Sequence, residues 1–459
     1  MSSSSLLSHL QACLAAYSSS SQRFVLALSG GMDSRVLLDL MAQYQAKHQA
    51  EGQTIDVIAV HVHHGLSKNA DTWAQQCQTW SQQVGIPCVV EHVTLSNTQG
   101  ESIEQLARHA RYQALAKHVV AGDVLLTAQH GDDQMETFLL ALKRGSGPAG
   151  LAAMPVCTAF GNGKHVRPLL TVSRADIEAY ATAQKLDWVE DESNQDTRYD
   201  RNFLRHHITP QLAQRWPGIR KAVGRSAALC GEQEALLAEL LADKLASALQ
   251  SDGSLALAAL TNARLGKALI RQWLQAQQVL MPSQAQLEQV WQSVVLAKDD
   301  ANPQVNWHHY QLRRYAQRLY LIQQWPDIQG QEFALTLNQP CLLPQDLGQL
   351  WLTPCKEAST EPQLAHGDEQ QALRLRQPIP QEVVTVRFDP EGVQVKPLGR
   401  VGKRKMKKLF QEYGVPSWNR RRTPLVFYGE QLAAVAGLFV VDGFAGKECE
   451  LTWHNSLSG

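Results

Sequence analysis

The chain has 459 residues, of which 44% are hydrophobic and 19% are charged, and its formal net charge is zero. This length exceeds one ordinary hydrophobic core, so roughly two to four domains are expected. No apolar run approaches the ~18 residues that a membrane-spanning helix needs. The eight cysteines are scattered without a CxxC pair, which argues against a disulfide framework, a zinc ribbon and an iron–sulfur site.

The first residues predict a helix rather than a targeting segment. A positively charged start is missing, and apolar residues recur at helical spacing: Leu6, Leu7, Leu10, Leu14 and Tyr17. We therefore expect an amphipathic helix here and a cytoplasmic protein.

Between residues 23 and 128, β-rich apolar runs alternate with helical patterns. The runs lie at 23–28, 55–61, 88–94 and 123–128, and the helical patterns at 34–47, 68–84 and 102–119. Ser102 and Gln105 form a capping box for the last of these helices. The alternation predicts βαβ units and an α/β domain with a doubly wound parallel sheet. The carboxyl ends of its strands meet at one edge, where ligands bind in such sheets.

A glycine-rich turn follows the first strand. It reads Ser29, Gly30, Gly31, Met32, Asp33 and Ser34. The glycines leave a backbone path without side chains, so successive N–H groups and the positive end of the next helix can hold a phosphate. Asp33 and Ser34 can cap that helix, or they can serve the metal and phosphate oxygens of a nucleotide. This order resembles the pyrophosphate loop of the ATP pyrophosphatase superfamily.

Two further polar clusters follow strands and should lie at the same sheet edge. In the first, lining of the nucleotide pocket is favoured for His63 and His64 over metal binding, because no carboxylate stands at ligand spacing; His61 is expected to pack. The second contains His130, Asp132 and Asp133. If a helix starts here, Asp133 and Glu136 share one face. These acids form either a functional pair or a simple complement to the helix dipole.

Beyond the first domain, at residues 1–215, the pattern changes. Residues 216–325 are predicted to be all-helical, without a strand signal before about Tyr310. Residues 326–369 are interpreted as a connector with one strand at 350–352. Residues 370–459 predict a small α+β domain with strands at 383–388 and 425–428.

This last domain contains a strongly basic segment. Ten Lys or Arg and one Glu lie between Lys396 and Arg422, whereas the rest of the chain has an acidic excess. Phe410, Tyr413 and Trp418 are interleaved with the charges; they can stack on bases or form a core, and a core is favoured for the first two. We predict that the segment binds RNA phosphates through Lys403, Arg404, Lys405, Lys407, Lys408, Arg420, Arg421 and Arg422.

Ordered motifs along nearly the whole chain resemble the tRNA(Ile)-lysidine synthetase family. They are SGGMDS at 29–34, HVHHGLS at 61–67, HGDDQMET at 130–137, RGSGPAGL at 144–151, RPLL at 167–170, EDESN at 190–194 with YDRNFLR at 199–205, PLGR at 397–400 and KLFQEYGVPSW at 408–418. Arg35 departs from the family pattern, in which many members have a small or apolar residue; it can meet a phosphate or face solvent.

The resemblance implies an enzyme that attaches lysine to carbon 2 of the wobble cytidine of a tRNA(Ile) with a CAU anticodon, with ATP and magnesium as cofactors. In a first step the oxygen on carbon 2 attacks the α-phosphate, and in a second step L-lysine displaces AMP. The partners are this tRNA, contacted by the middle and C-terminal domains, and lysine. The sequence leaves the oligomeric state open, with a homodimer as one arrangement.

The same resemblance implies a role for each candidate site residue. The nucleotide is held by the residues of the 29–34 loop with His63 and His64, and the metal by Asp33. Asp133 and Glu136 anchor the lysine α-amino group or accept a proton from its side chain; the sequence does not separate these roles. Further catalytic or substrate-binding candidates are His130, Asp132, Arg108, Arg111, Arg144 and Arg205.

Two alternatives compete with this reading. One is another tRNA-modifying ATP pyrophosphatase of the thiolase type, which the absence of paired cysteines disfavours. The other is a non-catalytic RNA-binding protein on the same fold, which the intact motifs at 29–34 and 132–136 disfavour.

Overall fold

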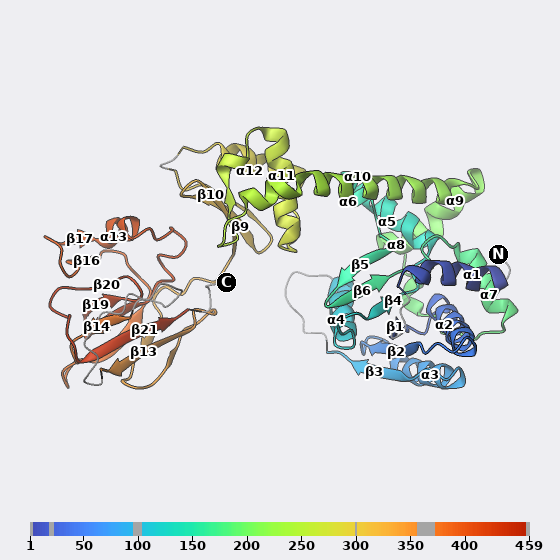
Figure 1. Ribbon diagram of the computed structural model, residues 1–459, viewed down its shortest axis with the longest axis horizontal. Helices are drawn as coiled ribbons and strands as arrows, with labels where there is room; N and C mark the ends of the chain where they lie inside the picture. The colour runs from blue at the N-terminus through green and yellow to red at the C-terminus, as the bar shows by residue number, and fades with distance from the viewer. Residues whose placement is uncertain (1–2, 18–22, 95–102, 299–300, 356–371, 456–459) are drawn as a thin grey trace. The chain divides into compact units, whose positions relative to one another are not determined.

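The computed structural model describes residues 3–17, 23–94, 103–298, 301–355 and 372–455 (Figure 1). The chain divides into two compact units, Met1–Leu240 and Leu241–Gly459, which we call unit 1 and unit 2. Among the helices described, none is long and apolar enough to cross a membrane. The predicted capping box at Ser102 lies outside the described residues.

Unit 1 is built around a six-stranded sheet of order β3-β2-β1-β4-β6-β5. Neighbouring strands pair in parallel, except that β5 runs antiparallel to β6. The predicted parallel sheet is therefore confirmed, with one antiparallel edge strand. The strands are β1 (Arg23–Ala27), β2 (Asp56–His63), β3 (Cys88–His92), β4 (Val124–Leu126), β5 (Cys157–Phe160) and β6 (Gly163–Val166).

Helices cover both faces of this sheet because its central strands are apolar on both sides. Along β1, Phe24 and Leu26 pack into a cluster with Leu37 of α2, whereas Val25 packs with Leu115 on the α4 side. This is the pattern of a doubly wound fold. The helices around the sheet are α1 (Ser3–Leu14), α2 (Met32–Ala50), α3 (Ala70–Gln83), α4 (Ile103–Ala116), α5 (Gly131–Lys143) and α7 (Arg174–Ala183).

Unit 1 also contains short helical segments, one before β5 and the others after α7, and the latter lead into one long helix. They are α6 (Pro148–Leu151), η2 (Glu192–Gln195), α8 (Asp200–Phe203), a π-helical turn η3 (Leu204–Ile208), α9 (Thr209–Arg215) and α10 (Ile219–Ala248). Helices α5 and α8 pack against each other, which brings the arginines of the 199–205 motif to the first turns of α5.

The first part of unit 2 is helical, as predicted, but it also contains a small antiparallel sheet of order β7-β10-β9-β8. Two of its strands, β7 (Leu255–Ala256) and β8 (Gln304–Trp307), precede Tyr310, so the expectation of no earlier strand was wrong. Both are too short for a clear periodic signal. The other elements are η4 (Leu257–Ala259), α11 (Ala263–Ala276), α12 (Gln284–Val290), η5 (Trp291–Val295), β9 (Tyr310–Tyr315) and β10 (Arg318–Gln323).

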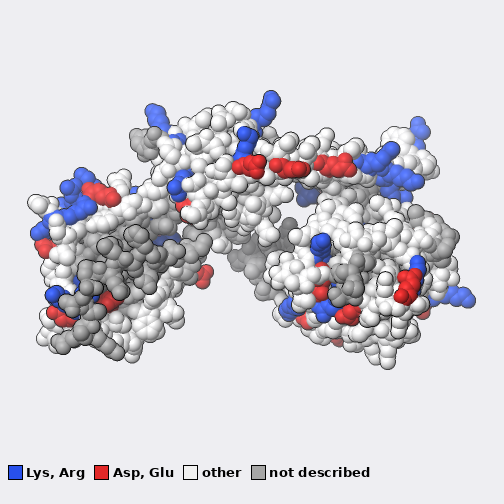
Figure 2. Space-filling model, in the orientation of Figure 1, with Lys and Arg blue, Asp and Glu red and all other residues white. Residues whose placement is uncertain are grey.

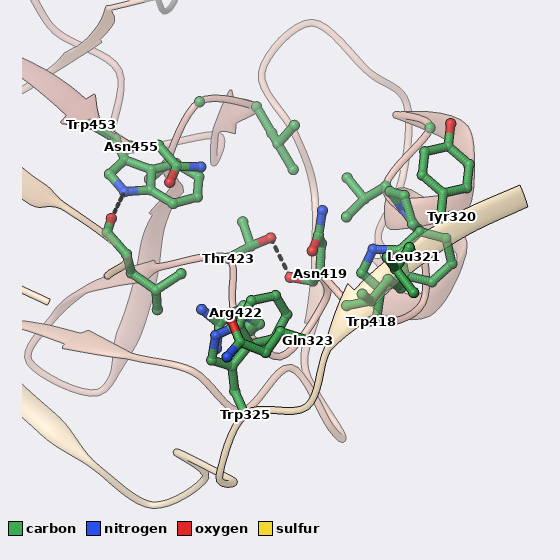
Figure 3. Close-up of a pocket in the computed structure, with 18 residues that line it drawn as sticks. Tyr320, Leu321, Gln323, Trp325, Trp418, Asn419, Arg422, Thr423, Trp453 and Asn455 are labelled. Atoms are coloured by element: carbon green, nitrogen blue, oxygen red, sulfur yellow. Dashed lines mark hydrogen bonds between the residues drawn. The ribbon is translucent and has the colours of Figure 1, made fainter. Parts of the chain in front are cut away.

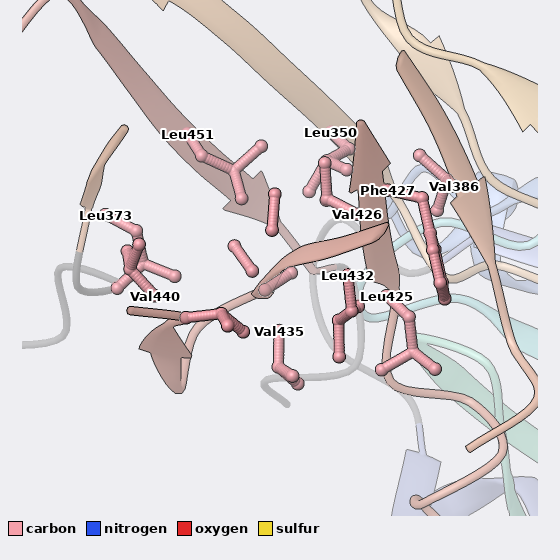
Figure 4. Close-up of a cluster of buried hydrophobic side chains, with 14 of the residues drawn as sticks. Leu350, Leu373, Val386, Leu425, Val426, Phe427, Leu432, Val435, Val440 and Leu451 are labelled. Carbon is pink, nitrogen blue, oxygen red and sulfur yellow. The ribbon is translucent and has the colours of Figure 1, made fainter. Parts of the chain in front are cut away.

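The C-terminal part of unit 2 contains two larger antiparallel sheets, ordered β11-β15-β18-β19-β20 and β12-β13-β21-β14, and the pair β16-β17. Its elements are β11 (Glu332–Ala334), β12 (Cys341–Leu342), β13 (Gln349–Pro354), β14 (Leu373–Leu375), β15 (Val384–Arg387), β16 (Gln394–Val395), β17 (Arg404–Lys405), α13 (Met406–Glu412), β18 (Leu425–Tyr428), β19 (Gln431–Val435), β20 (Phe439–Val440) and β21 (Cys449–His454). Figure 4 shows its core, where Leu350, Val426 and Leu451 are buried together.

Strand pairing ties the predicted connector to the C-terminal sheets. Instead of one strand at 350–352, this region contains β11, β12 and β13. Strand β11 pairs with β15, and β13 pairs along its whole length with β21, from Gln349 opposite His454 to Pro354 opposite Cys449. The C-terminal fold therefore includes residues that precede position 355.

Candidate active site

The glycine-rich turn after β1 is held in one shape by its own hydrogen bonds. The Ser34 hydroxyl donates to the Gly31 carbonyl oxygen (2.9 Å) and accepts from the Gly30 N–H (3.2 Å), and the Gly30 carbonyl oxygen accepts from the Val189 N–H (3.0 Å). Helix α2 begins at Met32, and no side chain caps it. The N–H groups of its first turn are therefore left for an anionic ligand.

Gly30 is required at its position for two physical reasons. Its φ of +91° lies in the region that residues with a Cβ atom rarely adopt. A Cβ atom there would also lie 2.8 Å from Val189 Cγ2 and 3.2 Å from Cys77 Sγ, whereas at Gly31 the nearest atom is 3.7 Å away. The loop backbone thus depends on glycine at position 30 far more than at position 31.

Asp33 presents a carboxylate oxygen without a partner. Its side chain is 30% exposed, Oδ1 is buried without a hydrogen bond, and Oδ2 lies 3.6 Å from His130 Nε2. Burial opposes ionisation of Asp33, but His130 and nearby arginines outweigh it and lower the pKa of the carboxyl group. A charged, unpaired oxygen beside a phosphate-binding turn fits a hard cation such as Mg²⁺, which takes few protein ligands and completes its shell with phosphates and water.

Within the described ranges, no three metal-ligating side chains cluster. A magnesium ion at Asp33 would therefore take most of its ligands from nucleotide and solvent.

His130 joins this loop to helix α5. The side chain, 1% exposed, caps α5: Nδ1 accepts from the N–H groups of Asp132 (3.2 Å) and Asp133 (3.4 Å). In return, Asp133 Oδ2 accepts from the His130 N–H (3.1 Å). This pattern assigns the proton of the neutral ring to Nε2, which lies 3.4 Å from Asp133 Oδ2 and 3.6 Å from Asp33 Oδ2.

Burial and the surrounding carboxylates act in opposite directions on the pKa of His130. Burial would lower the pKa of the ring, but the carboxylates of Asp33, Asp133 and Asp132 outweigh it and raise the pKa. The Nε2 atom of His130 lies between the acid of the phosphate loop and an acid of α5.

The three acids of α5 have different partners. Asp132 is bound by Arg220 (2.6 Å) and by the backbone N–H of Arg174 (2.9 Å), so both oxygens stabilise the packing of α5 with α7 and α10. Asp133 and Glu136 instead face Arg205. This separates Asp132, a predicted substrate residue, from the other two.

Arg205 forms a fork with Glu136. Arg205 Nε donates to Glu136 Oε1 (2.7 Å), and its Nη2 donates to Glu136 Oε2 (2.9 Å) and to Asp133 Oδ1 (3.0 Å). Arg201 Nε lies 3.3 Å from Glu136 Oε2. Glu136 is 1% exposed at its side chain, whereas Asp133 is 16% exposed. Burial raises the pKa of Glu136 in spite of the two arginines, and the ion pairs outweigh burial in raising the pKa of Arg205.

The three histidines at the end of β2 and just after it have different surroundings. His61 is buried, and its Nδ1 donates to the Leu28 carbonyl oxygen (2.9 Å), which confirms the predicted packing role. His63 Nε2 lies 3.0 Å from Asp71 Oδ1. His64 Nε2 accepts from Arg111 Nε (3.4 Å), while its buried Nδ1 has no partner. Burial lowers the pKa of His64 to about 4, so the neutral ring keeps Nδ1–H as a spare donor.

The structure also places Arg108, Arg144 and Arg35. Arg108 lies over the Tyr112 ring, 5.2 Å from its centroid, and Arg144 donates to the Leu140 carbonyl oxygen. Arg35 is buried (6% exposed) and lies 5.6 Å from the Trp80 ring centroid. The solvent-facing alternative for Arg35 is therefore excluded.

Three family models match this chain. Residues 4–212 match the PP-loop domain, residues 255–320 the TilS substrate binding domain, and residues 384–457 the TilS substrate C-terminal domain. The tRNA(Ile)-lysidine synthase of Photobacterium profundum is 61% identical over 98% of this chain and 99% of its own length. That of Vibrio campbellii is 49% identical over 99% and 100%.

The chain belongs to the tRNA(Ile)-lysidine synthase family. This membership agrees with the first of the three hypotheses from the sequence. The thiolase and the non-catalytic alternatives lose their support.

The basic segment of this family member presents four lysines to solvent. One lysine lies just before β17, one lies on β17 and two lie on α13. Within the described part of the chain, no acidic side chain forms an ion pair with these lysines. We call these residues the lysine surface: Lys403, Lys405, Lys407 and Lys408. Figure 2 shows Lys and Arg side chains gathered over α13 and β17, at the left of the view. Behind it, Phe410 is buried and Tyr413 stacks on Phe439, which confirms their predicted core role.

The arginines of the segment are engaged within the synthase fold. Arg404 lies 3.3 Å from Glu412, and Arg421 pairs with Glu391 and Asp327. Arg420 Nε donates to the Val415 carbonyl oxygen, and Arg422 is buried (7% exposed). The exposed, unpaired charge is thus concentrated in the lysine surface.

Several site residues were not found from the sequence. Arg201 contacts Glu136 and lies in the 199–205 motif, which could have pointed to it. Arg220 contacts Asp132, but a lone arginine on a helix has no signal that separates it from a surface charge. Val189, which hydrogen-bonds to the phosphate loop, is an ordinary apolar residue.

Replacing Gly30 by alanine should destabilise unit 1, since it combines a left-handed φ with a 2.8 Å contact. Such strain costs about 1–3 kcal/mol. Differential scanning calorimetry of the full chain should show a lower unfolding temperature for Gly30→Ala and little change for Gly31→Ala. Equal shifts for the two variants would contradict the special requirement at position 30.

Proposed function

We propose that this protein ligates L-lysine to carbon 2 of the wobble cytidine of a tRNA(Ile) with a CAU anticodon, through an adenylated tRNA, with release of pyrophosphate and then AMP. The observation that carries the proposal is the position of His130, which lies near Asp33 of the phosphate-binding turn and near Asp133 of α5. The chain also has a synthase relative that matches it over nearly its full length. Cytoplasmic location belongs to the same proposal, because tRNA is the substrate.

In the first step, the oxygen on carbon 2 of cytidine attacks the α-phosphorus of ATP, and the bond to pyrophosphate breaks. Negative charge develops on the phosphate oxygens. The uncapped N–H groups at the start of α2 would stabilise it from a fixed position. When bound, Mg²⁺ would be held by Asp33 and would neutralise part of the phosphate charge.

In the second step, the ε-amine of lysine attacks carbon 2, the bond from carbon 2 to the AMP oxygen breaks, and the amine loses a proton. A free lysine has a pKa near ~10.4, so a neutral amine at pH 7 costs roughly 4–5 kcal/mol. A carboxylate near the amine can orient it or accept its proton.

The contacts suggest different roles for the two acids. Glu136 is buried and satisfied by Arg205 and Arg201, so it would act by positioning Arg205. Asp133 is more exposed and lies between Arg205 and His130, so it is the acid that lysine can reach. We infer that Asp133 contacts lysine and that Glu136 sets the position of Arg205.

Asp33→Asn should abolish pyrophosphate release and leave tRNA binding unchanged, because the variant removes charge next to ATP and not at the RNA-binding surface. Loss of one such group costs about a hundredfold or more in rate. Release is measured with radiolabelled ATP and tRNA. Asp56→Asn, an exposed acid at the amino end of β2, is the control. Normal turnover of Asp33→Asn at saturating magnesium would contradict the assignment.

Asp133→Asn should retain pyrophosphate release but need more lysine, since a charge-assisted contact worth roughly 1.5–3 kcal/mol, about ten to a hundredfold, is lost. If Asp133 accepts the proton instead, the maximal rate should fall and partly recover at high pH. Glu136→Gln should slow both steps, because Arg205 loses its partner.

Pyrophosphate release and lysine incorporation are measured separately on the same samples. Equal loss of both activities in Asp133→Asn would place this acid in the ATP site and remove the lysine contact.

The lysine surface should account for much of the salt dependence of tRNA binding. Each phosphate contact contributes about 0.7–0.9 to the log–log slope of affinity against salt. Replacing Lys403, Lys405, Lys407 and Lys408 together by glutamine should make that slope shallower by about 3. Lys447→Gln, which is exposed elsewhere in unit 2, is the control. An unchanged slope in the fourfold variant would show that this surface is only solvated.

A further inference from the structure

Unit 2 contains a cavity of about 630 Å³ that the proposed reaction does not use. Its walls come from the end of β10 and the residues after it, from the loop between α13 and β18, and from β21 (Figure 3). Its volume is in the range of sites that bind small molecules or single residues of a polymer, about 300–1,000 Å³.

The lining of the cavity is aromatic and lacks negative charge. Tyr320, Trp325, Trp418 and Trp453 contribute rings, and Arg422 is the charged residue among the described lining residues, which include no Asp or Glu. Aromatic rings can stack on a flat ring of a ligand, and the single cation can attract a negatively charged group of the same ligand.

Arg422 is a buried cation that is only partly satisfied. Its terminal nitrogens donate to Gln345 Oε1 (2.6 Å) and to the Gln345 carbonyl oxygen (2.9 Å), and its guanidinium lies 3.9 Å from the Trp325 ring centroid. The side chain is 7% exposed, and its buried Nε has no partner. A buried donor without an acceptor is costly, and the Arg422 guanidinium places a positive charge at the wall of the cavity.

The Arg313 guanidinium lies over one face of the Trp418 ring, 5.7 Å from its centroid, so a base would stack on the opposite face. Among the described residues, no aromatic ring lies parallel to Trp418. Tyr320 is tilted by 51° at 5.3 Å between centroids, and Tyr315 is nearly perpendicular at 5.9 Å. The ring is half-buried and lines the cavity. Asn419 lies beside it, with a side-chain amide that can pair with the edge of a base.

Part of the cavity wall belongs to the basic segment. Trp418, Asn419 and Arg422 lie in that segment, and the lysine surface precedes them in the sequence on β17 and α13. The same segment therefore contains lysines that can contact phosphates and an aromatic ring that can contact a base. Proteins that bind single-stranded nucleic acid combine these two features.

We propose that this cavity binds one unpaired nucleotide of the tRNA substrate, with its base stacked on Trp418 and with an acceptor group facing Arg422. The inference rests on the proposed function, because it takes tRNA as the ligand. A free adenine nucleotide has the same chemistry and is the other source that the experiment must separate.

The experiment measures equilibrium binding of an unmodified tRNA(Ile) transcript to the full chain. Trp418→Leu should weaken binding about 5- to 150-fold, the range for loss of one base–aromatic stack. Trp418→Phe keeps a ring and should stay close to the wild type. Trp351→Leu, on β13 and outside the cavity lining, is the matched control. Wild-type affinity in Trp418→Leu would overturn the proposal.

If Trp418→Leu does not fold, chemical probing of the tRNA bases in complex with the wild-type protein tests the proposal instead. At least one unpaired base outside the anticodon loop should be protected, and the protection should persist in Trp418→Phe. Absence of any such protection would overturn the proposal.

Titration with AMP separates the two sources. If AMP binds in a Trp418-dependent manner while tRNA affinity does not depend on Trp418, the cavity is a free-nucleotide site and the proposal is overturned. Failure of the wild type to bind tRNA or to incorporate lysine would instead remove the proposed function. Normal wild-type activity without dependence on Trp418 removes only the cavity site.

Discussion

The cap that His130 forms on helix α5 is the contact on which the rest of the site depends. One ring nitrogen fixes the first turn of α5, and the other lies between Asp33 and Asp133. The imidazole therefore sets the distance between the 29–34 loop and the first turn of α5. Because it is fully buried, it cannot change its rotamer without opening the helix N-terminus.

Around this cap, the three acids of α5 differ in the cations that they contact. Asp132 has Arg220, and Glu136 has Arg205 and Arg201. Asp133 shares Arg205 and His130 and is the least committed of the three. In the proposed reaction, Asp133 is the acid whose partners a cationic amine can displace, while the other two acids stay paired.

Much of this arrangement could be predicted from the sequence, for reasons that differ between elements. The sheet of unit 1 follows from buried strands such as β1, and the phosphate loop from two glycines at a strand–helix junction. The pairing of Arg205 with Glu136 could not be predicted, because it joins residues 69 positions apart through the packing of α8 on α5. Strands as short as β7 and β12 carry no periodic signal, and their existence depends on partners elsewhere in the chain.

The pairing of β13 with β21 has a consequence for biosynthesis. Strand β21 is an inner strand of its sheet, between β13 and β14. Its partner β13 leaves the ribosome about a hundred residues earlier, and until β21 follows, one edge of β13 stays unpaired. Pairing over such a long sequence separation is slow. During this interval the unpaired edge of β13 can pair with a strand of another chain, which is a route to aggregation.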